Sequence, residues 1–226
     1  SNSYDYIICG AGCAGLSLLM RMIRSGKFND KKVLLLDKEP KTKNDRTWCF
    51  WERDNGFFED VVYRKWDSIS FLSNEYSSLM NIAPYQYKMI RGIDFYQYCF
   101  KEIAKHTNIE VAYGDIERWF YDDDGAVVFT INNQQFSLGN AQVFNSIYEP
   151  HDATPKTIRL LQHFKGWVIE TNEPIFDRNE ATMMDFRVSQ QHGTTFAYVL
   201  PFSATSALVE YTLFTKELLQ PEQYDK

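Results

Sequence analysis

A glycine-rich turn near the start of the chain carries the residues best suited to hold a ligand. Its residues are Gly10, Ala11, Gly12, Cys13, Ala14 and Gly15. The spacing G-x-G-x-x-G suits a turn that binds the pyrophosphate of a dinucleotide. Gly10 allows a tight turn, Gly12 lets the backbone approach the phosphates, and Gly15 lets a helix pack against a strand. The pattern therefore predicts a nucleotide-binding site.

The elements that must position this turn are also present. Residues 4–9 and 33–36 are apolar runs that predict strands, and residues 16–23 predict the helix between them. Free N–H groups and the dipole at the start of that helix attract phosphates. Asp37 ends the second strand, where an acid accepts hydrogen bonds from ribose hydroxyls, and we assign Lys38 beside it to the same site. The alternative is a glycine-rich turn in an ordinary α/β unit.

Composition excludes several other classes of protein. The net charge is −6, so the chain lacks the basic surface of a nucleic-acid-binding protein. Its four cysteines form no C-x-x-C pair and are expected to be free thiols in a reducing compartment. Its four histidines are scattered, which argues against a metal site. No signal peptide is visible, and no apolar stretch is long enough to span a membrane. We expect a cytoplasmic protein.

The middle of the chain predicts a second mixture of strands and one helix. Residues 38–56 are polar and predict irregular structure. A helix is expected to start at Gly92 or Ile93, with Asp94 in its first turn. The expected strands are 68–73, 78–82, 86–90, 109–113 and 141–144, and the stretch 115–121 and 126–138 is expected to be rich in β-hairpins. Asp122–Gly125 predicts a solvated hairpin turn, and 141–144 could return to the first sheet.

From about residue 157 the pattern changes to long strands. The runs 163–171, 181–189, 194–202 and 205–214 predict an antiparallel sheet that covers one face of a pocket, to which 68–90 could add. We therefore expect an α/β fold in which a Rossmann-type FAD/NAD(P)-binding domain is interleaved with an antiparallel substrate domain. The expected segments are 1–66 and 91–156 for the first domain, and 67–90 and 157–226 for the second.

Five strings of residues resemble the lycopene cyclase family. They are Asn44-Asp45-Arg46-Thr47-Trp48-Cys49-Phe50-Trp51, Gly166-Trp167-Val168-Ile169-Glu170, Met184-Asp185-Phe186-Arg187, Phe196-Ala197-Tyr198-Val199-Leu200-Pro201-Phe202-Ser203 and Leu208-Val209-Glu210-Tyr211-Thr212. The first is nearly a signature of the family, and the matches run in the family's order from about residue 4 to 214. The resemblance implies an FAD-binding fold like that of flavin monooxygenases and geranylgeranyl reductases.

The same resemblance implies an activity. Members of the family cyclise the linear ends of lycopene to β-ionone rings, an isomerisation without net redox change. It implies reduced FAD as the cofactor, NADPH as its reductant, and peripheral contact with the membrane that holds the polyene. A true oxidoreductase of the same fold, a monooxygenase or an isoprenoid reductase, is the alternative. A third reading is a chain that binds a nucleotide or a partner without catalysis.

Cyclisation begins with protonation of an alkene carbon, which needs a buried carboxylic acid. Glu210 matches the acidic motif of the family and is the first candidate; its alternative is a solvated strand residue. The family's motif has a second acid where this chain has Tyr211, which could only orient Glu210. Asp185 is the second candidate, and its alternative is a cross-strand ion pair with Arg187.

The first string adds residues around the cofactor. Arg46 suits a contact with the flavin pyrophosphate or ring; otherwise it pairs with Asp45 or caps a turn. Trp48, Phe50 and Trp51 could line a polyene tunnel or be core residues. Flavoproteins of this type carry a second flavin-contacting segment near the C-terminus, and none follows residue 214. We therefore expect an N-terminal part of a longer protein, in which FAD binding is weakened.

Overall fold

The computed structural model describes residues 3–148, 154 and 156–224, and the chain divides into two units. The first comprises residues 1–46 and 92–150, and the second comprises 47–91 and 151–226. The boundary therefore falls earlier than residue 66, where the sequence pattern places it. The reason is that Thr47–Glu52 forms a strand that pairs within the second unit.

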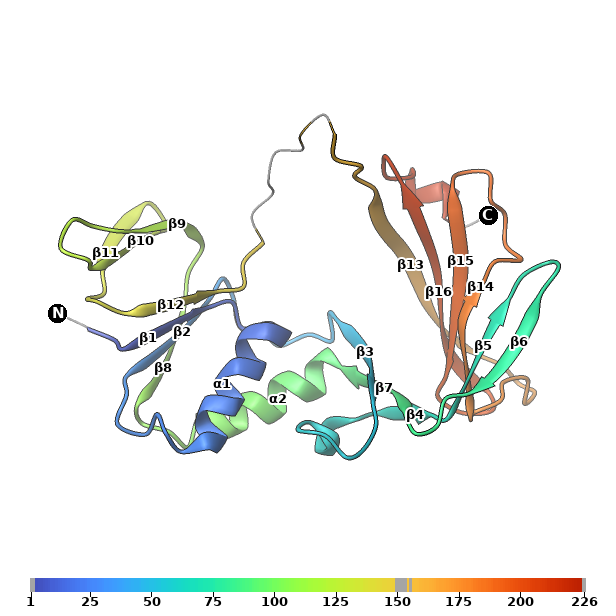
Figure 1. Cartoon of the computed structure of the whole chain (residues 1–226), viewed down its shortest axis with the longest axis horizontal. Helices are drawn as coiled ribbons and strands as arrows, with labels where there is room; N and C mark the ends of the chain where they lie inside the picture. Colours follow the sequence, from blue (N-terminus) through green and yellow to red (C-terminus); the bar gives the residue numbers. More distant parts are fainter. Residues whose placement is uncertain (1–2, 149–153, 155, 225–226) are drawn as a thin grey trace. The chain divides into compact units, whose positions relative to one another are not determined.

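A parallel sheet of four strands is the centre of the first unit (Figure 1). Its order is β12 (Gln142–Asn145), β1 (Tyr6–Cys9), β2 (Val33–Asp37) and β8 (Ile109–Tyr113). The two helices are α1 (Cys13–Ser25) and α2 (Gly92–Ile103). β12 pairs with β1, so the predicted return of residues 141–144 to the first sheet is confirmed.

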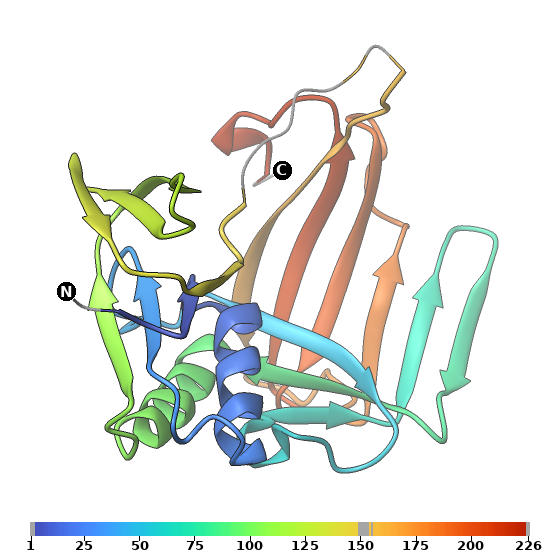
Figure 2. The ribbon, with the colours of Figure 1, turned by 60° about the vertical axis from the view of Figure 1, so that its left-hand side comes forward.

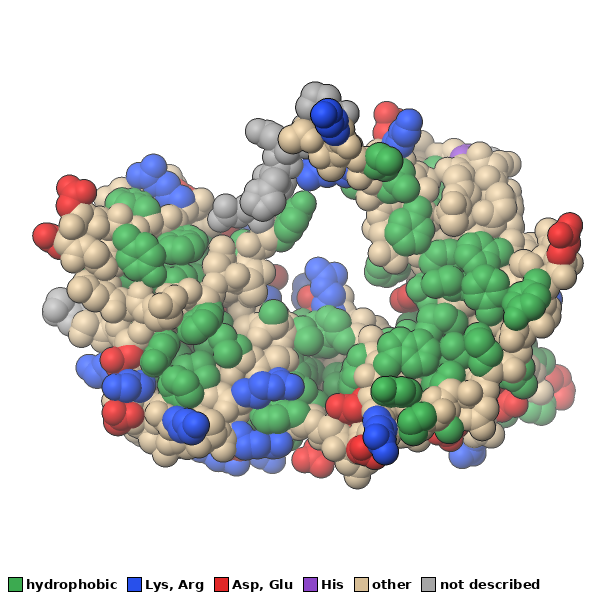
Figure 3. All heavy atoms as spheres, in the orientation of Figure 1, with side chains coloured by type: hydrophobic (Ala, Val, Ile, Leu, Met, Phe, Trp, Pro, Cys, Tyr) green, Lys and Arg blue, Asp and Glu red, His purple; other side chains and the backbone are tan. Residues whose placement is uncertain are grey.

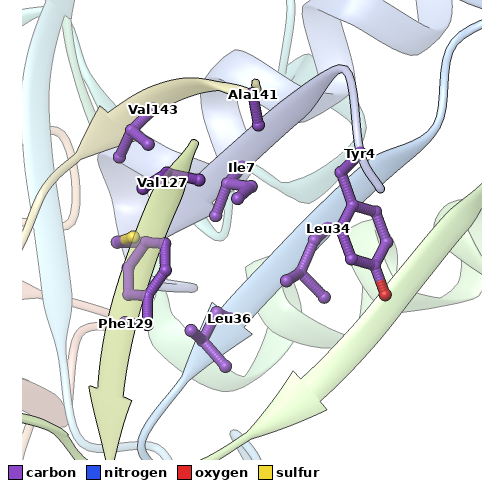
Figure 4. Close-up of a cluster of buried hydrophobic side chains, with 9 residues drawn as sticks. Tyr4, Ile7, Leu34, Leu36, Val127, Phe129, Ala141 and Val143 are labelled. Atoms are coloured by element: carbon purple, nitrogen blue, oxygen red, sulfur yellow. The ribbon is translucent and has the colours of Figure 1, made fainter. Parts of the chain in front are cut away.

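A small antiparallel sheet packs on this parallel sheet. It consists of β9 (Ile116–Tyr121), β10 (Val127–Ile131) and β11 (Gln134–Ser137). Ile7 and Leu36 of the parallel sheet share a buried cluster with Phe129 of β10 (Figure 4). The hairpin-rich stretch 126–138 contains the hairpin of β10 and β11, because Asn132 and Asn133 adopt left-handed backbone angles (φ 50° and 62°) that turn the chain.

The second unit contains two sheets. In the smaller one, β7 (Gln86–Arg91) lies between β3 (Thr47–Glu52) and β4 (Arg64–Trp66), and both pairings are antiparallel. The prediction that 38–56 is irregular is thus wrong for 47–52: aromatic and β-branched side chains favour a strand there, although the flanks are polar. A short 3₁₀ turn, η1 (Glu59–Val61), precedes β4.

The larger sheet has six strands (Figure 2). Its order is β13 (Leu161–Glu170), β16 (Ser206–Thr215), β15 (Thr194–Pro201), β14 (Glu180–Asp185), β5 (Ser68–Leu72) and β6 (Ser77–Asn81). The first four strands are antiparallel as predicted, but β14 pairs with β5 in parallel, and β7 belongs to the smaller sheet. β14 ends at Asp185 rather than 189.

Trp66 anchors the core of this second unit. Its side chain is fully buried and its Nε1–H donates a hydrogen bond to the carbonyl oxygen of Pro201, 3.2 Å away. The core cluster joins the two sheets through Tyr87 and Met89 of β7 and Leu200 of β15. A second 3₁₀ turn, η2 (Pro221–Gln223), follows β16. In the part of the chain described, no helix has the length and apolar character needed to cross a membrane.

Candidate functional site

The glycine turn connects β1 directly to α1. Gly10 has a φ of +100°, a region that side-chain-bearing residues rarely adopt. A Cβ on Gly15 would lie 1.9 Å from the carbonyl oxygen of Gly10, so only glycine lets α1 approach the turn. A Cβ on Gly12 would meet no atom within 4 Å, so the space beside its backbone is open. These positions have the geometry that the roles assigned to the three glycines require.

The start of α1 is available to an anion. Gly12 occupies the N-cap position, and no side chain among the described residues caps the helix there. The first turn of α1 contains no acidic residue, so its N–H groups and dipole are not compensated locally. The turn residues Cys13 and Ala14 are exposed. A phosphate group would find donors at this place, which fits a dinucleotide cofactor.

Asp37 ends β2 beside the turn and is only 6% exposed. One carboxylate oxygen accepts a hydrogen bond from the backbone N–H of Ala11 at 2.6 Å, which ties the strand to the turn. The other oxygen lies 2.9 Å from Nζ of Lys41. A carboxylate has further acceptor sites, so these contacts leave room for a ribose hydroxyl. Lys38 instead extends to Asp115, 3.1 Å away, at the surface.

The segment that carries Arg46 is fastened to the start of α2. The Ile93 N–H donates a hydrogen bond to the Asn44 side chain at 3.3 Å, and the Gly92 N–H donates to the carbonyl oxygen of Arg46 at 2.7 Å. The Tyr96 hydroxyl donates to the Asp45 carboxylate at 3.1 Å. Asp45 is thus bonded to Tyr96, and the Arg46 side chain donates to the backbone oxygen of Asp45 at 3.4 Å. The contact of Arg46 with a cofactor stays a prediction.

Glu210 lies in the middle of β16 and is half-buried. Its direct cross-strand neighbours are Gly166 on β13 and Tyr198 on β15. Burial raises the pKa of its carboxyl group, and nothing else shifts it. Among the described residues, no ion pair or hydrogen bond engages its side chain. At a given pH, a larger fraction of Glu210 is therefore protonated than of an exposed glutamate.

Three titratable groups among the described residues interact with Glu210, and all are uncharged at neutral pH. Cys49 of β3 and Tyr87 of β7 share a hydrogen bond and lie within electrostatic range of Glu210, as does Tyr198. Burial raises the pKa of all three, for Cys49 to about 12. They are therefore neutral at pH 7 and add no positive charge that would stabilise the Glu210 carboxylate. The sequence analysis names Cys49 and Tyr198 only as members of the motif strings and does not single out Tyr87. The contacts between strands that bring the three residues together leave no local pattern.

Tyr211 points to the other face of the sheet. Successive residues of a strand alternate between faces, and Tyr211 is paired with Lys165 and Ala197. Its side chain therefore does not share the surroundings of Glu210. The tyrosine beside the acid is Tyr198, on the neighbouring strand.

Asp185 is engaged in an ion pair. Nε of Arg187 lies 2.9 Å from one of its carboxylate oxygens and Nη2 lies 2.8 Å from the other. Hydrogen bonds from Arg187 hold the pKa of Asp185 below its usual range. The pair is formed within one segment at the end of β14 rather than across strands. This geometry favours the structural interpretation of Asp185, since a carboxyl group with a lowered pKa is a poor proton donor.

The aromatic string lies on β3, paired with β7. Trp51 is 48% exposed, and its ring packs 4.8 Å from that of Tyr87, measured between centroids. Trp48 and Phe50 are half-buried. The aromatic side chains of this string are therefore neither fully buried nor fully exposed. Their contact with a polyene stays a prediction.

Lys88 is a buried charge that sequence reasoning also missed. Its side chain is fully buried on β7, and Nζ lies 3.0 Å from Glu52, 2.7 Å from Glu59 and 2.7 Å from the carbonyl oxygen of Asp54. Burial raises the pKa of Glu59, but hydrogen bonds from Lys65 and Lys88 outweigh it and bring the value to about 2. The sequence feature that indicates this buried charge is a lysine inside the apolar run 87–90. Lys88 is the cross-strand partner of Phe50, so the network lies beside the aromatic string on β3.

The remaining polar residues show no metal site. In the described ranges 3–148, 154 and 156–224, no three His, Cys, Asp or Glu side chains are grouped as ligands. Asp122 closes its hairpin turn by accepting hydrogen bonds from the N–H groups of Asp124 and Ala126, at 3.1 and 2.8 Å. All four cysteines are free thiols, as predicted.

Sequence comparison identifies the family and a curated relative of this chain. The family described as "Lycopene cyclase protein" matches residues 5–226. A lycopene beta-cyclase of Pantoea ananas is 23% identical over 225 residues, which cover 97% of this chain and 54% of that protein. The chain thus spans about half the length of this curated relative.

Solved structures resemble the fold. A probable FAD-dependent monooxygenase of Pseudomonas aeruginosa, pqsL, has a TM-score of 0.60 at 13% identity over 94% of this chain and 61% of that one. A geranylgeranyl bacteriochlorophyll reductase-like protein of Thermoplasma acidophilum has a TM-score of 0.63 at 11% identity over 94% and 57%. At such identities the likeness shows the fold alone, and it confirms the predicted interleaving of a Rossmann-type domain with a sheet domain.

Proposed function

Because the chain belongs to the lycopene cyclase family, we propose that the protein containing it cyclises the linear ends of lycopene to β-ionone rings. The observation that carries this proposal is the state of Glu210: half-buried, free of ion pairs among the described residues, surrounded by neutral groups, and raised in pKa. A carboxyl group of this kind suits the protonation of a terminal alkene carbon. The activity is proposed for the whole protein, since the chain spans about half of its relative.

In the proposed reaction Glu210 donates its proton to the alkene carbon, and a neighbouring double bond captures the cation and closes the ring. Loss of a proton then gives the cyclic product, so no net oxidation or reduction occurs. Tyr198, Tyr87 and Cys49 keep the surroundings of the acid neutral and partly exclude water, which favours the protonated carboxyl group. Exposed aromatic rings such as Trp51 suit contact with a conjugated chain and with positive charge.

We propose FAD as the cofactor of the first unit. Gly10 to Gly15 and the start of α1 would hold its pyrophosphate, and Asp37 its adenosine ribose. When bound in reduced form, FAD supplies negative charge that stabilises a cation, and NADPH is the proposed reductant. Arg46 and Lys38 are proposed to complete the site at its polar edge.

The experiment is expression in cells that accumulate lycopene, with wild type beside Glu210→Gln and pigments separated by chromatography. The expected result is β-carotene from wild type and unchanged lycopene from the variant, with equal FAD content in both. Unchanged lycopene from a wild type that holds FAD would refute the cyclase.

The alternative is an oxidoreductase of the same fold, favoured by the likeness to a monooxygenase and to a reductase-like protein. The two proposals differ in stoichiometry. A cyclase converts many equivalents of lycopene per NADPH, whereas a monooxygenase or a reductase consumes at least one NADPH for each product. Measuring both quantities in one anaerobic and one aerobic reaction distinguishes them.

We also propose peripheral contact with the membrane that dissolves the substrate. Hydrophobic side chains gather over the six-stranded sheet on the side shown in Figure 3. Around β6, at the edge of this sheet, Tyr76 is 58% exposed, Leu79 65% and Tyr85 51%. Flotation with phospholipid vesicles tests the contact: binding should fall for Leu79→Ser and persist for Ser77→Thr on the same strand.

A further inference from the structure

Gly166 interrupts a row of large side chains on β13. Residues 164, 166 and 168 share one face of the strand, and Phe164 and Val168 are 60% and 64% exposed. β13 pairs with β16 over ten consecutive positions without a register shift, so no bulge accounts for the glycine. Glycine in the interior of a strand is unfavourable and often marks the close approach of another group.

The group that approaches Gly166 is the side chain of Glu210. A Cβ on Gly166 would lie 3.0 Å from Cγ of Glu210 and 3.5 Å from its Oε1. The first distance is tighter than nine in ten natural contacts of a Cβ, so the glutamate would have to shift by a few tenths of an ångström. The Glu210 side chain therefore leans over the bare backbone of Gly166.

Tyr198 bounds Glu210 on the opposite side. It is the direct cross-strand partner of Glu210 on β15, and partners of this kind have side chains in contact distance. The ring of Tyr198 packs 5.1 Å from that of the buried Phe196, which limits its movement. A Glu210 side chain displaced from Gly166 toward β15 would therefore approach the ring of Tyr198.

We propose that Gly166 is the positioning residue of the Glu210 acid: its missing side chain provides the space that the carboxyl group uses. This inference rests on the proposed function for its catalytic consequence, but not for its structural one. Side chains at 166 displace the carboxyl group from the position in which its proton reaches the substrate. A displacement of a few tenths of an ångström lowers the rate of a proton transfer, which depends on the alignment of the acid with the substrate.

The test compares Gly166→Ala and Gly166→Val with Val168→Ala, which alters the same face of β13 beside Leu208 instead of Glu210. Cyclisation by Gly166→Ala should fall at least about fivefold and by Gly166→Val further, in kcat more than in KM. Thermal stability should stay the same or rise, because alanine and valine favour a strand more than glycine does. A purely structural role of Gly166 predicts lower stability and unchanged kcat in the folded fraction.

A second readout does not depend on cyclisation. The C=O stretching band of the protonated Glu210 carboxyl, identified by its absence in Glu210→Gln, is followed by infrared difference spectroscopy against pH. Its midpoint should move by about half a pH unit or more in Gly166→Val and not in Val168→Ala. Unchanged midpoints and unchanged kcat in both Gly166 variants would overturn the proposal. If the wild type does not cyclise lycopene but the midpoint of the band moves in Gly166→Val, only the proposed function is refuted.

A double variant completes the test. Alanine has no Cγ, so Glu210→Ala removes the contact with residue 166. Adding Gly166→Ala to Glu210→Ala should therefore raise the unfolding temperature by more than the same change does in the wild-type background. Equal changes in both backgrounds would show that the alanine acts independently of Glu210 and would contradict the proposal.

Discussion

Glu210 on β16 and Tyr198 on β15 are direct cross-strand neighbours, each with a raised pKa. Burial is the first cause for both, and for Tyr198 the nearby Glu210 adds to it. The pair brings an acid and a neutral hydroxyl together, and no cation among the residues that the structure describes shifts the Glu210 carboxyl group. This relationship sets the expected pH dependence of the protein.

Stability should fall as pH rises because of Glu210. Its pKa in the folded chain lies above the ordinary value of 4.5, so the native state binds more protons than the unfolded state above that pH. Glu210→Gln should therefore unfold at a higher temperature than wild type at pH 8, and the difference should vanish near pH 4. Calorimetric scans over this range measure it. A difference that is constant with pH would show that Glu210 is not raised in pKa.

Cyclase activity should tolerate the loss of Asp185. Its carboxylate is held by Arg187, and the lowered pKa keeps it ionised at neutral pH. Asp185→Asn should keep most of the β-carotene produced in lycopene-accumulating cells, whereas Glu210→Gln should lose at least about a hundredfold, as removal of a general acid does. A null phenotype in a folded Asp185→Asn protein would instead make Asp185 the acid.

Two glycines of the turn should respond differently to alanine. Gly15→Ala places a Cβ 1.9 Å from a backbone oxygen and should lower the free energy of unfolding by about 2 to 3 kcal/mol. Gly12→Ala meets open space, so it should leave stability unchanged but weaken FAD binding by blocking the approach of the pyrophosphate. Denaturant unfolding and flavin fluorescence titration measure the two effects. Equal FAD affinity in Gly12→Ala and wild type would argue against cofactor binding at this turn.

Lys88→Met should destabilise the second unit. It leaves Glu52 and Glu59 close together without the buried ammonium group between them, a loss of about 3 kcal/mol for a broken buried pair. Adding Glu59→Gln should recover part of that loss, since one uncompensated charge disappears. Urea unfolding of the single and double variants measures both steps. Additive losses in the double variant would mean that the two residues do not interact.

Acid should weaken the attachment of the C-terminal turn to β13. His163 Nε2 lies 2.7 Å from Thr215 Oγ1 and Nδ1 lies 2.6 Å from the Tyr224 hydroxyl, and burial lowers the pKa of His163 below 6.5. A lowered pKa means that this contribution to stability is complete above pH 6.5 and is lost as pH falls through the folded value. Hydrogen exchange of residues 215–224 should therefore accelerate between pH 7 and 5. In Tyr224→Phe the pH effect should be smaller, and an equal effect would exclude the Tyr224 contact.

The sequence by itself determined the elements that depend on interactions between residues close together in the chain. The glycine spacing, the flanking apolar runs and Asp37 predict the strand–turn–helix–strand unit, because backbone freedom and periodicity act over a few residues. The same holds for α2, which begins at Gly92 as expected, and for the four long strands after residue 157. The aromatic string 47–52 was misjudged because its strand exists only through pairing with β7.

Only the tertiary structure decided which of the two acids stands alone. Glu210 and Asp185 are both acids in strand patterns, yet one faces Gly166 and Tyr198 while the other meets an arginine at a strand end. Burial and charge compensation depend on neighbours far apart in sequence, such as Cys49 and Tyr87 beside Glu210. The order of strands in a sheet fixes those neighbours, and strand order is a property of the whole chain rather than of any segment.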